Sequence, residues 1–169
     1  MPLIELPLLL PGKIFRSPMP FSKRDPGERL WDEYLQANIK AVVLLADYEE
    51  TMLRAKRDLL SLYRETGWDV IALPIPDYNV PEAGALEQAV EKAYQAAKSG
   101  KNIVIHCYAG VGRTGLFAAC LARRVFGYSG ERAVSWIRQY IPGAVETAEQ
   151  EMIVEAFAST DAQIEEGGI

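Results

Sequence analysis

The chain of 169 residues is 49% hydrophobic and 24% charged, which predicts one soluble globular domain over residues 1–169 with a core of its own. Its net charge of −5 excludes a nucleic-acid partner held by bulk charge, so any phosphate site must concentrate positive potential locally. The N-terminal extension, residues 1–11, is apolar but short and broken by prolines. It is expected to pack as an extended edge segment rather than to act as a signal peptide or to cross a membrane.

Hydrophobic periodicity and the positions of Gly and Pro predict the elements in chain order. These are a strand at 12–17, a helix at 26–39, a strand at 40–47, a helix at 49–67, a strand at 68–76, a helix at 81–100, a strand at 102–107, and helices at 113–126, 130–140 and 147–158. The last three strands are continuous apolar runs, as expected for strands buried on both faces. The tail at 161–169 is expected to be flexible.

The alternation of strands and helices predicts the fold class. It indicates a single α/β domain with a mostly parallel central sheet, flanked by helices and followed by a C-terminal helical segment. Parallel sheets of this kind bind ligands beyond the carboxyl ends of their strands. Three reactive side chains fall at such ends: Asp47, Asp77 and Cys107.

The stretch VIHCYAGVGRTG, residues 104–115, follows one of these strands and contains the only His of the chain. Its GVGRTG matches G-x-G-x-x-G, but no second strand with an acidic end follows about 20 residues on, so a dinucleotide site is disfavoured. No Gly-Lys-Ser/Thr follows for a Walker loop, and one His with two Cys does not supply a zinc site. His106 and Cys107 are neighbours on a strand and should face opposite sides, so His106 is not expected to be the base for Cys107.

The loop itself offers a way to activate the thiol. Between Cys107 and Arg113, the backbone N–H groups can point inward at the positive end of a helix dipole, where they would bind an anion or stabilise a thiolate. Gly110 and Gly112 would allow positive φ angles in this turn. Arg113 would add a planar fork for two phosphate oxygens.

HCYAGVGRTG resembles the H-C-x-x-G-x-x-R-[ST]-G signature of the cysteine-dependent protein tyrosine phosphatase superfamily, with every fixed position filled. Size and layout resemble the small dual-specificity branch, and GAVETAEQE resembles kinase-associated and Cdc14-like members. The resemblance implies Cys107 as nucleophile, Arg113 as ligand of the phosphoryl group, Thr114 as the hydroxyl that stabilises the departing thiolate, and Asp77 as general acid on a mobile loop. The substrate phosphate would bind the loop formed by Tyr108, Ala109, Gly110, Val111, Gly112 and Arg113.

Supporting roles are expected at several further positions. His106 should bond backbone near the loop, and Asp47 is the rival general acid or a group that shapes the pocket. Gln150 matches a late glutamine that positions the hydrolytic water, with an exposed helix residue as the alternative. Arg16 resembles an early Arg-Ser of some family members, with a structural ion pair as the favoured alternative. Cys120 is expected to be core packing rather than a redox partner of Cys107.

The resulting hypothesis is a cytoplasmic, monomeric phosphatase that needs no metal or cofactor and acts on phosphotyrosine in phosphoprotein or phosphopeptide substrates. Phosphoserine and phosphothreonine are possible additional substrates. A phosphoinositide or small-molecule phosphatase is the alternative enzyme, disfavoured because Tyr108, Ala109 and Val111 make the loop neutral. A phospho-binding module without turnover is the alternative outside the enzymes. No membrane and no nucleic acid are expected as partners.

Overall fold

The computed structural model describes residues 3–82 and 84–157 and contains one five-stranded sheet. The strands lie in the order β1-β2-β5-β3-β4. Their bounds are β1 Ile4–Leu6, β2 Ile14–Ser17, β3 Ile39–Leu44, β4 Asp69–Ala72 and β5 Asn102–His106. All neighbouring strands are parallel except β1 and β2, so the predicted α/β class with a mostly parallel sheet is confirmed.

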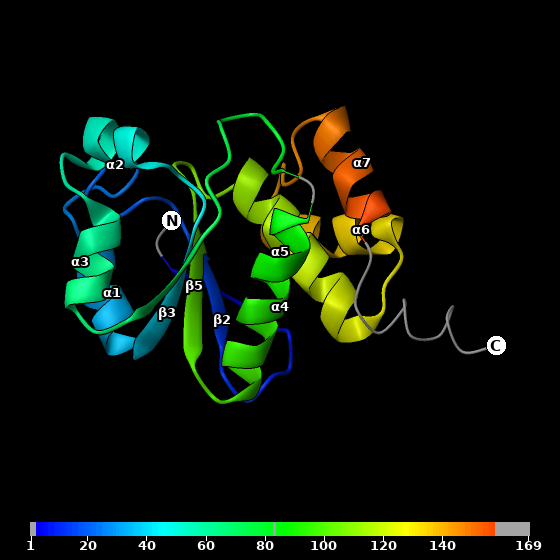
Figure 1. The fold of residues 1–169 in the computed structure, drawn as a ribbon, viewed down its shortest axis with the longest axis horizontal. Coiled ribbons are helices and arrows are strands. Elements are labelled where there is room, and N and C mark those ends of the chain that lie inside the picture. The colour runs from blue at the N-terminus through cyan, green and yellow to red at the C-terminus, as the bar shows by residue number, and fades with distance from the viewer. Residues whose placement is uncertain (1–2, 83, 158–169) are drawn as a thin grey trace.

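Helices cover both faces of this sheet (Figure 1). They are α1 Leu30–Gln36, α2 Tyr48–Ala55, α3 Leu59–Glu65, α4 Ala85–Lys98, α5 Gly112–Phe126, α6 Gly130–Tyr140 and α7 Ala148–Ala156. In Figure 1, α1 and α3 lie on one side of the sheet and α4 to α7 on the other. This arrangement explains why a run of helices follows the last strand, because together they build the thicker layer of the domain.

The central strands contribute to two apolar cores, one on each face of the sheet. Ala41 and Val43 of β3 pack in the core with α4 and α5, while Val42 and Leu44 pack in the core with α1 and α3. Successive side chains of a strand point to opposite faces, so a strand buried on both faces is apolar at every position. The continuous apolar run in the sequence is therefore accounted for.

Two predicted helices are shorter than expected. The helix predicted at 26–39 begins only at Leu30, because residues before it form a turn in which the carboxylate of Asp25 accepts from the backbone N–H groups of Arg29 and Leu30. The helix predicted at 49–67 is divided into α2 and α3. Lys56 adopts φ 59°, and Asp58 caps a new helix by accepting from the N–H of Ser61.

Of the two predictions that concern the edge strands of the sheet, one is confirmed and one is wrong. The prediction of an extended N-terminal edge segment is confirmed, since β1 pairs antiparallel with β2 and buries Leu6. The prediction of a fully buried strand at 68–76 is wrong, because β4 is the opposite edge and exposes Asp69 and Ala72. Beyond Ala72, Leu73 and Ile75 still donate to the carbonyls of Leu44 and Leu45, while Pro74 and Pro76 have no N–H to donate.

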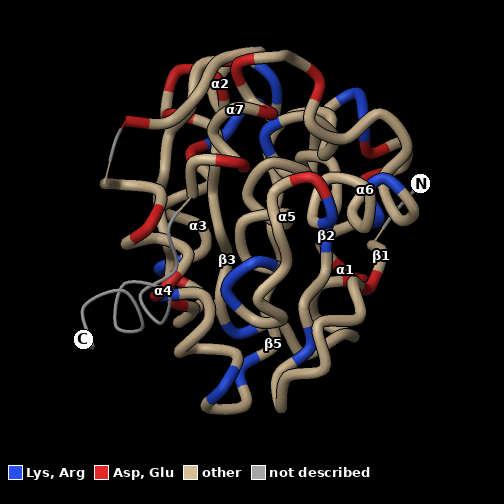
Figure 2. Tube along the Cα trace, turned by 90° about the vertical axis from the view of Figure 1, so that its right-hand side faces the viewer, with Lys and Arg blue, Asp and Glu red and all other residues tan. Residues whose placement is uncertain are grey.

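No described helix is both long and apolar enough to cross a membrane. The tail predicted at 161–169 lies outside the described residues. Figure 2 shows acidic and basic residues together at the end of the molecule that carries α2 and α7. The carboxyl ends of the parallel strands point to this end.

Candidate active site

The carboxyl ends of three neighbouring strands, β5, β3 and β4, lie at one level of the sheet. Leu44 of β3 pairs with both Ala72 of β4 and His106 of β5. The loop at residues 107–112, here called the catalytic loop, leads from β5 into α5, and residues 73–82, here called the acid loop, arch above this end of the sheet (Figure 1). Cys107 directly follows β5, and Asp77 reaches Arg113 of the same site, whereas Asp47 caps α2 just after β3.

Cys107 lies at the bottom of the catalytic loop and is 2% exposed. Its Sγ accepts hydrogen bonds from the backbone N–H of Gly110 and the hydroxyl of Thr114, both at 3.2 Å. Donors aimed at sulfur favour the thiolate over the thiol because they stabilise the negative charge. The start of α5 has no side-chain cap, so the hydroxyl of Thr114 serves the sulfur rather than the helix end.

The loop is held from the side by β2. Nη2 and Nε of Arg16 donate to the carbonyl of Gly110 at 2.6 and 3.1 Å, and the N–H of Met19 donates to the carbonyl of Tyr108. Gly110 has φ 73°, and a Cβ there would collide with the carbonyl of Ser17. The structural role of Arg16 is as expected, but the predicted ion pair is wrong, because its partner is a backbone carbonyl. The peptide groups of Gly110 are thus fixed from both sides, since its carbonyl accepts from Arg16 and its N–H donates to Sγ of Cys107.

His106 supports the loop from below and does not face the sulfur. It is completely buried, its Nδ1 lies 2.9 Å from the carbonyl of Cys107, and its Nε2 lies 2.7 Å from the hydroxyl of Tyr63 on α3. A carbonyl only accepts, so Nδ1 carries the proton and Nε2 accepts from Tyr63. Burial lowers the pKa of His106 to about 4, which keeps the ring neutral near pH 7. The expected bond to backbone near the loop is confirmed.

Arg113 lies in the first turn of α5 and is 2% exposed. Nη1 and Nη2 each donate to a carboxylate oxygen of Glu50 at 2.8 Å, and Nη1 also donates to the carbonyl of Ile75. Burial alone would lower the pKa of Arg113. The hydrogen bonds that it donates to Glu50 and the nearby charges of Cys107 and Asp77 raise this pKa above its ordinary value. The Nε atom is buried and has no hydrogen-bond partner among the described residues. A buried donor without a partner indicates a ligand that would complete it.

Sequence reasoning missed Glu50 and selected its neighbour Asp47. Asp47 caps α2, where its Oδ1 accepts from the backbone N–H of Glu50 at 2.8 Å. The cap thereby fixes the first turn of the helix that carries Glu50 to Arg113. The spacing of Asp47 and Glu50, that of an N-cap and its third helical residue, signals the helix start but not the pairing of Glu50 with Arg113.

Asp77 extends from the acid loop toward the same guanidinium. Its Oδ1 lies 3.2 Å from Nη2 of Arg113 and also accepts from the N–H of Tyr78. The side chain of Asp77 is 47% exposed. A carboxylate that is open to solvent on one side and reaches the loop on the other can exchange protons with water and with a bound group.

Gln150 is completely buried, so the alternative of an exposed helix residue is wrong. With Thr147 it forms a capping box at the start of α7, and its Oε1 accepts from the N–H groups of Glu146 and Thr147. Its Nε2 donates to the carbonyl of Asn79 at 3.1 Å. Gln150 therefore ties α7 to the acid loop.

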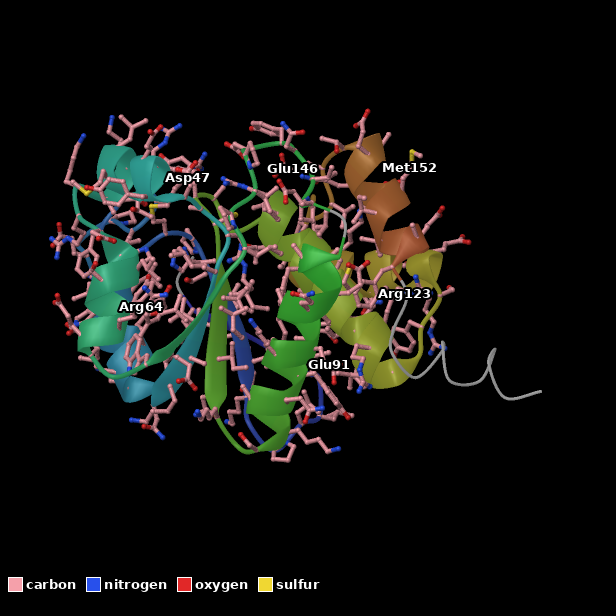
Figure 3. All side chains as sticks on the ribbon, viewed as in Figure 1. Asp47, Arg64, Glu91, Arg123, Glu146 and Met152 are labelled. Atoms are coloured by element: carbon pink, nitrogen blue, oxygen red, sulfur yellow. The ribbon has the colours of Figure 1, made fainter. Side chains whose placement is uncertain are left out.

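A second unexpected carboxylate lies near the catalytic loop. Glu146 approaches the start of α5, and its Oε1 lies 2.7 Å from the position that a Cβ on Gly112 would occupy. Gly112 does not have a positive φ, so the prediction of a positive φ at this position is wrong; a Cβ there would meet the side chain of Glu146. Figure 3 shows Asp47 and Glu146 at the same end of the molecule, one beside α2 and the other beside α5.

The second cysteine of the chain is separate from this chemistry. Cys120 is fully buried within α5, both cysteines are free, and burial raises the pKa of the Cys120 thiol. The expected packing role is confirmed. No group of three His, Cys, Asp or Glu side chains within residues 3–82 and 84–157 could hold a metal ion.

A strand, a thiol-containing loop, an arginine and a helix arranged in this way define the site of a cysteine-dependent phosphatase. Residues 22–125 match the family model described as "Polymorphic toxin system, DSP-PTPase phosphatase". The chain belongs to this family of dual-specificity phosphatases, and the predicted branch and enzyme class are confirmed.

Named relatives agree with this assignment. The chain is 30% identical to cyclin-dependent kinase inhibitor 3 of Rattus norvegicus over 121 residues, which cover 70% of this chain and 57% of the rat protein. It is 26% identical to the dual specificity protein phosphatase CDC14A of Homo sapiens over 159 residues, covering 89% of this chain and 25% of the human protein. The chain therefore spans little more than half, or less, of the length of these relatives.

The fold is similar to that of solved phosphatases. A structure of kinase associated phosphatase, in which the catalytic site cysteine is replaced by serine, superposes with a TM-score of 0.81 at 23% identity and covers 92% of each chain. Tk-PTP in its active form gives a TM-score of 0.70 at 31% identity over 85% of this chain and 88% of that one.

Proposed function

We propose that this protein hydrolyses phosphotyrosine in phosphoproteins, with phosphoserine and phosphothreonine as further substrates, through a phosphocysteine intermediate. The observation that carries the proposal is Sγ of Cys107 held between two donors at 3.2 Å, beside a buried guanidinium with an unpartnered Nε. A nucleophile and an anion-binding fork in one loop are what in-line transfer of a phosphoryl group needs.

In the first step, the Cys107 thiolate attacks phosphorus, and the bond from phosphorus to the leaving phenol oxygen breaks. The backbone N–H groups of residues 108–112 and the guanidinium of Arg113 would bind the equatorial oxygens, on which charge accumulates. Asp77 in its acid form gives its proton to the departing oxygen. The products of this step are the free tyrosine hydroxyl and phosphocysteine.

In the second step, a water molecule attacks the phosphocysteine, and the bond from phosphorus to sulfur breaks. Asp77, now a carboxylate, accepts a proton from this water, and inorganic phosphate leaves. The hydroxyl of Thr114, 3.2 Å from Sγ, stabilises the thiolate as it departs. We assign to Gln150 a supporting role through the acid loop, because its amide donates to Asn79.

We further propose that the protein works in the cytoplasm as a monomer and without a cofactor. Both cysteines are free, and a thiol nucleophile requires the reducing conditions that prevail in the cytosol. Each chemical role above is filled by a side chain of this one chain, which supports action as a monomer. Activity should survive EDTA and be blocked by vanadate, whereas a loss on chelation that added metal reverses would contradict the proposal.

The direct test replaces the nucleophile. Cys107→Ser should retain less than about 1% of the wild-type rate on a phosphotyrosine peptide and still bind it, because the cradle and Arg113 remain while the alkoxide is scarcely accessible. Cys120→Ser is the matched control and should keep its activity. A Cys107→Ser variant that retains more than about 1% of the wild-type rate would refute the mechanism. Binding without turnover by the wild type would indicate a binding module, and a preference for phosphoinositides would indicate a lipid phosphatase.

A further inference from the structure

A groove with a volume of about 640 Å³ opens beside the catalytic loop. It is lined by Tyr108 from the loop, by residues 21–23 and 25–28, and by Leu53, Arg54 and Lys56 at the end of α2. We call it the rim groove. Arg24 is not part of this lining, but its guanidinium lies over the ring of Tyr108. Tyr108 follows the nucleophile directly in sequence, so one wall of the groove is continuous with the phosphate site.

Two guanidinium groups lie against the ring of Tyr108. The Cζ atoms of Arg54 and Arg24 are 4.3 and 5.5 Å from the ring centroid. Neither arginine makes an ion pair within the described part of the chain. A cation–π contact orients a guanidinium without neutralising its charge, so both groups stay available to an anion.

The other charges of the groove do not cancel this pair. Lys23 and Lys56 add positive charge, and Glu28 is an exposed carboxylate on the same lining. Asp25 is buried, and its two oxygens accept from the backbone N–H groups of Phe21, Arg29 and Leu30. The groove is therefore locally basic on a chain of net charge −5, which concentrates the attraction for an anion at this place.

The rim groove lies outside the cradle for the scissile phosphate, so its ligand is a second anion on the same substrate. The catalytic loop has no cationic side chain at Tyr108, Ala109 or Val111. In a compact polyphosphate the second phosphate lies next to the one that is cleaved, so these positions would give it no ionic contact. An extended peptide separates its side chains by about 3.4 Å per residue and can carry a second phosphate past Tyr108 to the arginines. Phe21, Pro26 and Leu53 provide apolar surface for peptide side chains.

We propose that the rim groove is a subsite for a second phosphorylated residue, one to three positions from the phosphotyrosine that is cleaved. This inference rests on the proposed function. Arg24 and Arg54 would bind the second phosphate through charge-assisted hydrogen bonds, which arginine forms with two phosphate oxygens at once. The preferred substrates are then doubly phosphorylated segments.

The test compares two peptides that are identical except for a phosphoserine two residues from the phosphotyrosine. We expect the wild type to cleave the doubly phosphorylated peptide with a kcat/KM about tenfold higher, the effect of a single favourable ionic contact. Arg24→Ala/Arg54→Ala should abolish this ratio. Arg132→Ala is the matched control, because Arg132 also stacks on a tyrosine, at 4.1 Å from the Tyr128 ring, and it should keep the ratio. Thermal melting verifies that each variant is folded.

Every outcome decides the question. Equal kcat/KM for both peptides in the wild type, or an unchanged ratio in the double variant, would overturn the subsite. A double variant that loses activity on phosphoinositide vesicles while it retains the peptide ratio would reassign the groove to a lipid headgroup. If the wild type cleaves no phosphopeptide, the proposed function fails. The affinities of the two peptides, measured by calorimetry, then still show whether the groove binds the second phosphate.

Discussion

The catalytic loop and the acid loop contribute to one site but are held in different ways. The catalytic loop is fixed by buried hydrogen bonds from Arg16, His106 and Thr114, which come from three different elements. In the acid loop, Asp77 and Tyr78 are 47% and 65% exposed. A cradle for developing charge benefits from a rigid arrangement of donors, whereas a proton donor must approach and leave with the substrate. The difference in anchoring therefore matches the difference in proposed task.

The largest expected effect separates the two aspartates. Asp77→Asn should lower kcat by roughly 10²–10⁴-fold, the usual effect of one acid–base group. The loss should be greatest for alkyl phosphates, whose alcohol must be protonated as it departs, and small for p-nitrophenyl phosphate. The alkaline limb of the pH profile of kcat/KM should flatten as well. Steady-state kinetics on a series of leaving groups measures both effects.

Asp47→Asn is the control for this experiment. Because Asp47 caps α2, its substitution should alter stability or KM but not the dependence on the leaving group. If Asp47→Asn changes that dependence and Asp77→Asn does not, the assignment of the general acid is wrong. Glu146→Gln tests, in the same way, the carboxylate that lies beside Gly112 of the catalytic loop.

The second prediction concerns the pH dependence of stability through His106. Its pKa is about 4 in the folded protein against 6.5 as the ordinary value, so the unfolded chain binds the proton more tightly. The stabilisation is complete above pH 6.5 and is lost as pH falls toward 4. Between pH 7 and pH 4.5 the loss amounts to about 2 kcal/mol. Urea unfolding at both pH values should show that the free energy of unfolding of His106→Gln lacks this loss between pH 7 and pH 4.5. An equal pH dependence of stability in the wild type and in His106→Gln would contradict the prediction.

The third prediction tests how Arg113 is held. Glu50→Gln should lower kcat/KM by about tenfold, because a bidentate, charge-assisted pair with the buried guanidinium is weakened. Glu49→Gln removes the same charge from an exposed neighbour in the same turn of α2 and should change little. Equal effects of the two substitutions would show that only the overall charge matters.

The smallest expected effect links the two loops. Gln150→Met should lower kcat several-fold, because the donor to Asn79 is lost, and should cost about 1 kcal/mol of stability through the capping box. In an Asp77→Asn background the kcat effect should vanish, since the acid that the contact helps to position is already gone. A full kcat effect in both backgrounds would mean that Gln150 acts elsewhere, for instance on the hydrolytic water.

The sequence was informative where local chemistry determines the structure. The apolar runs of β3 and β5, and the residue types between Cys107 and Arg113, predicted the sheet and the nucleophile loop. It failed where partners are remote in sequence: nothing near Glu50 reveals that Arg113 lies beside it. The break between α2 and α3 depends on one left-handed residue, Lys56, and on a new cap. The edge position of β4 depends on the order of strands, which a single strand does not encode.

The central claim is that Cys107 carries the phosphoryl group during turnover, and trapping that intermediate tests it most directly. Wild-type protein would be mixed with a phosphotyrosine peptide, quenched in denaturant within milliseconds, digested and analysed by mass spectrometry. We expect one phosphate on the fragment that contains Cys107, and this phosphorylated fragment should form as tyrosine is released. The same fragment of Cys107→Ser should carry no phosphate. Release of tyrosine in a burst with no phosphate on Cys107, or with the phosphate on another residue, would contradict it.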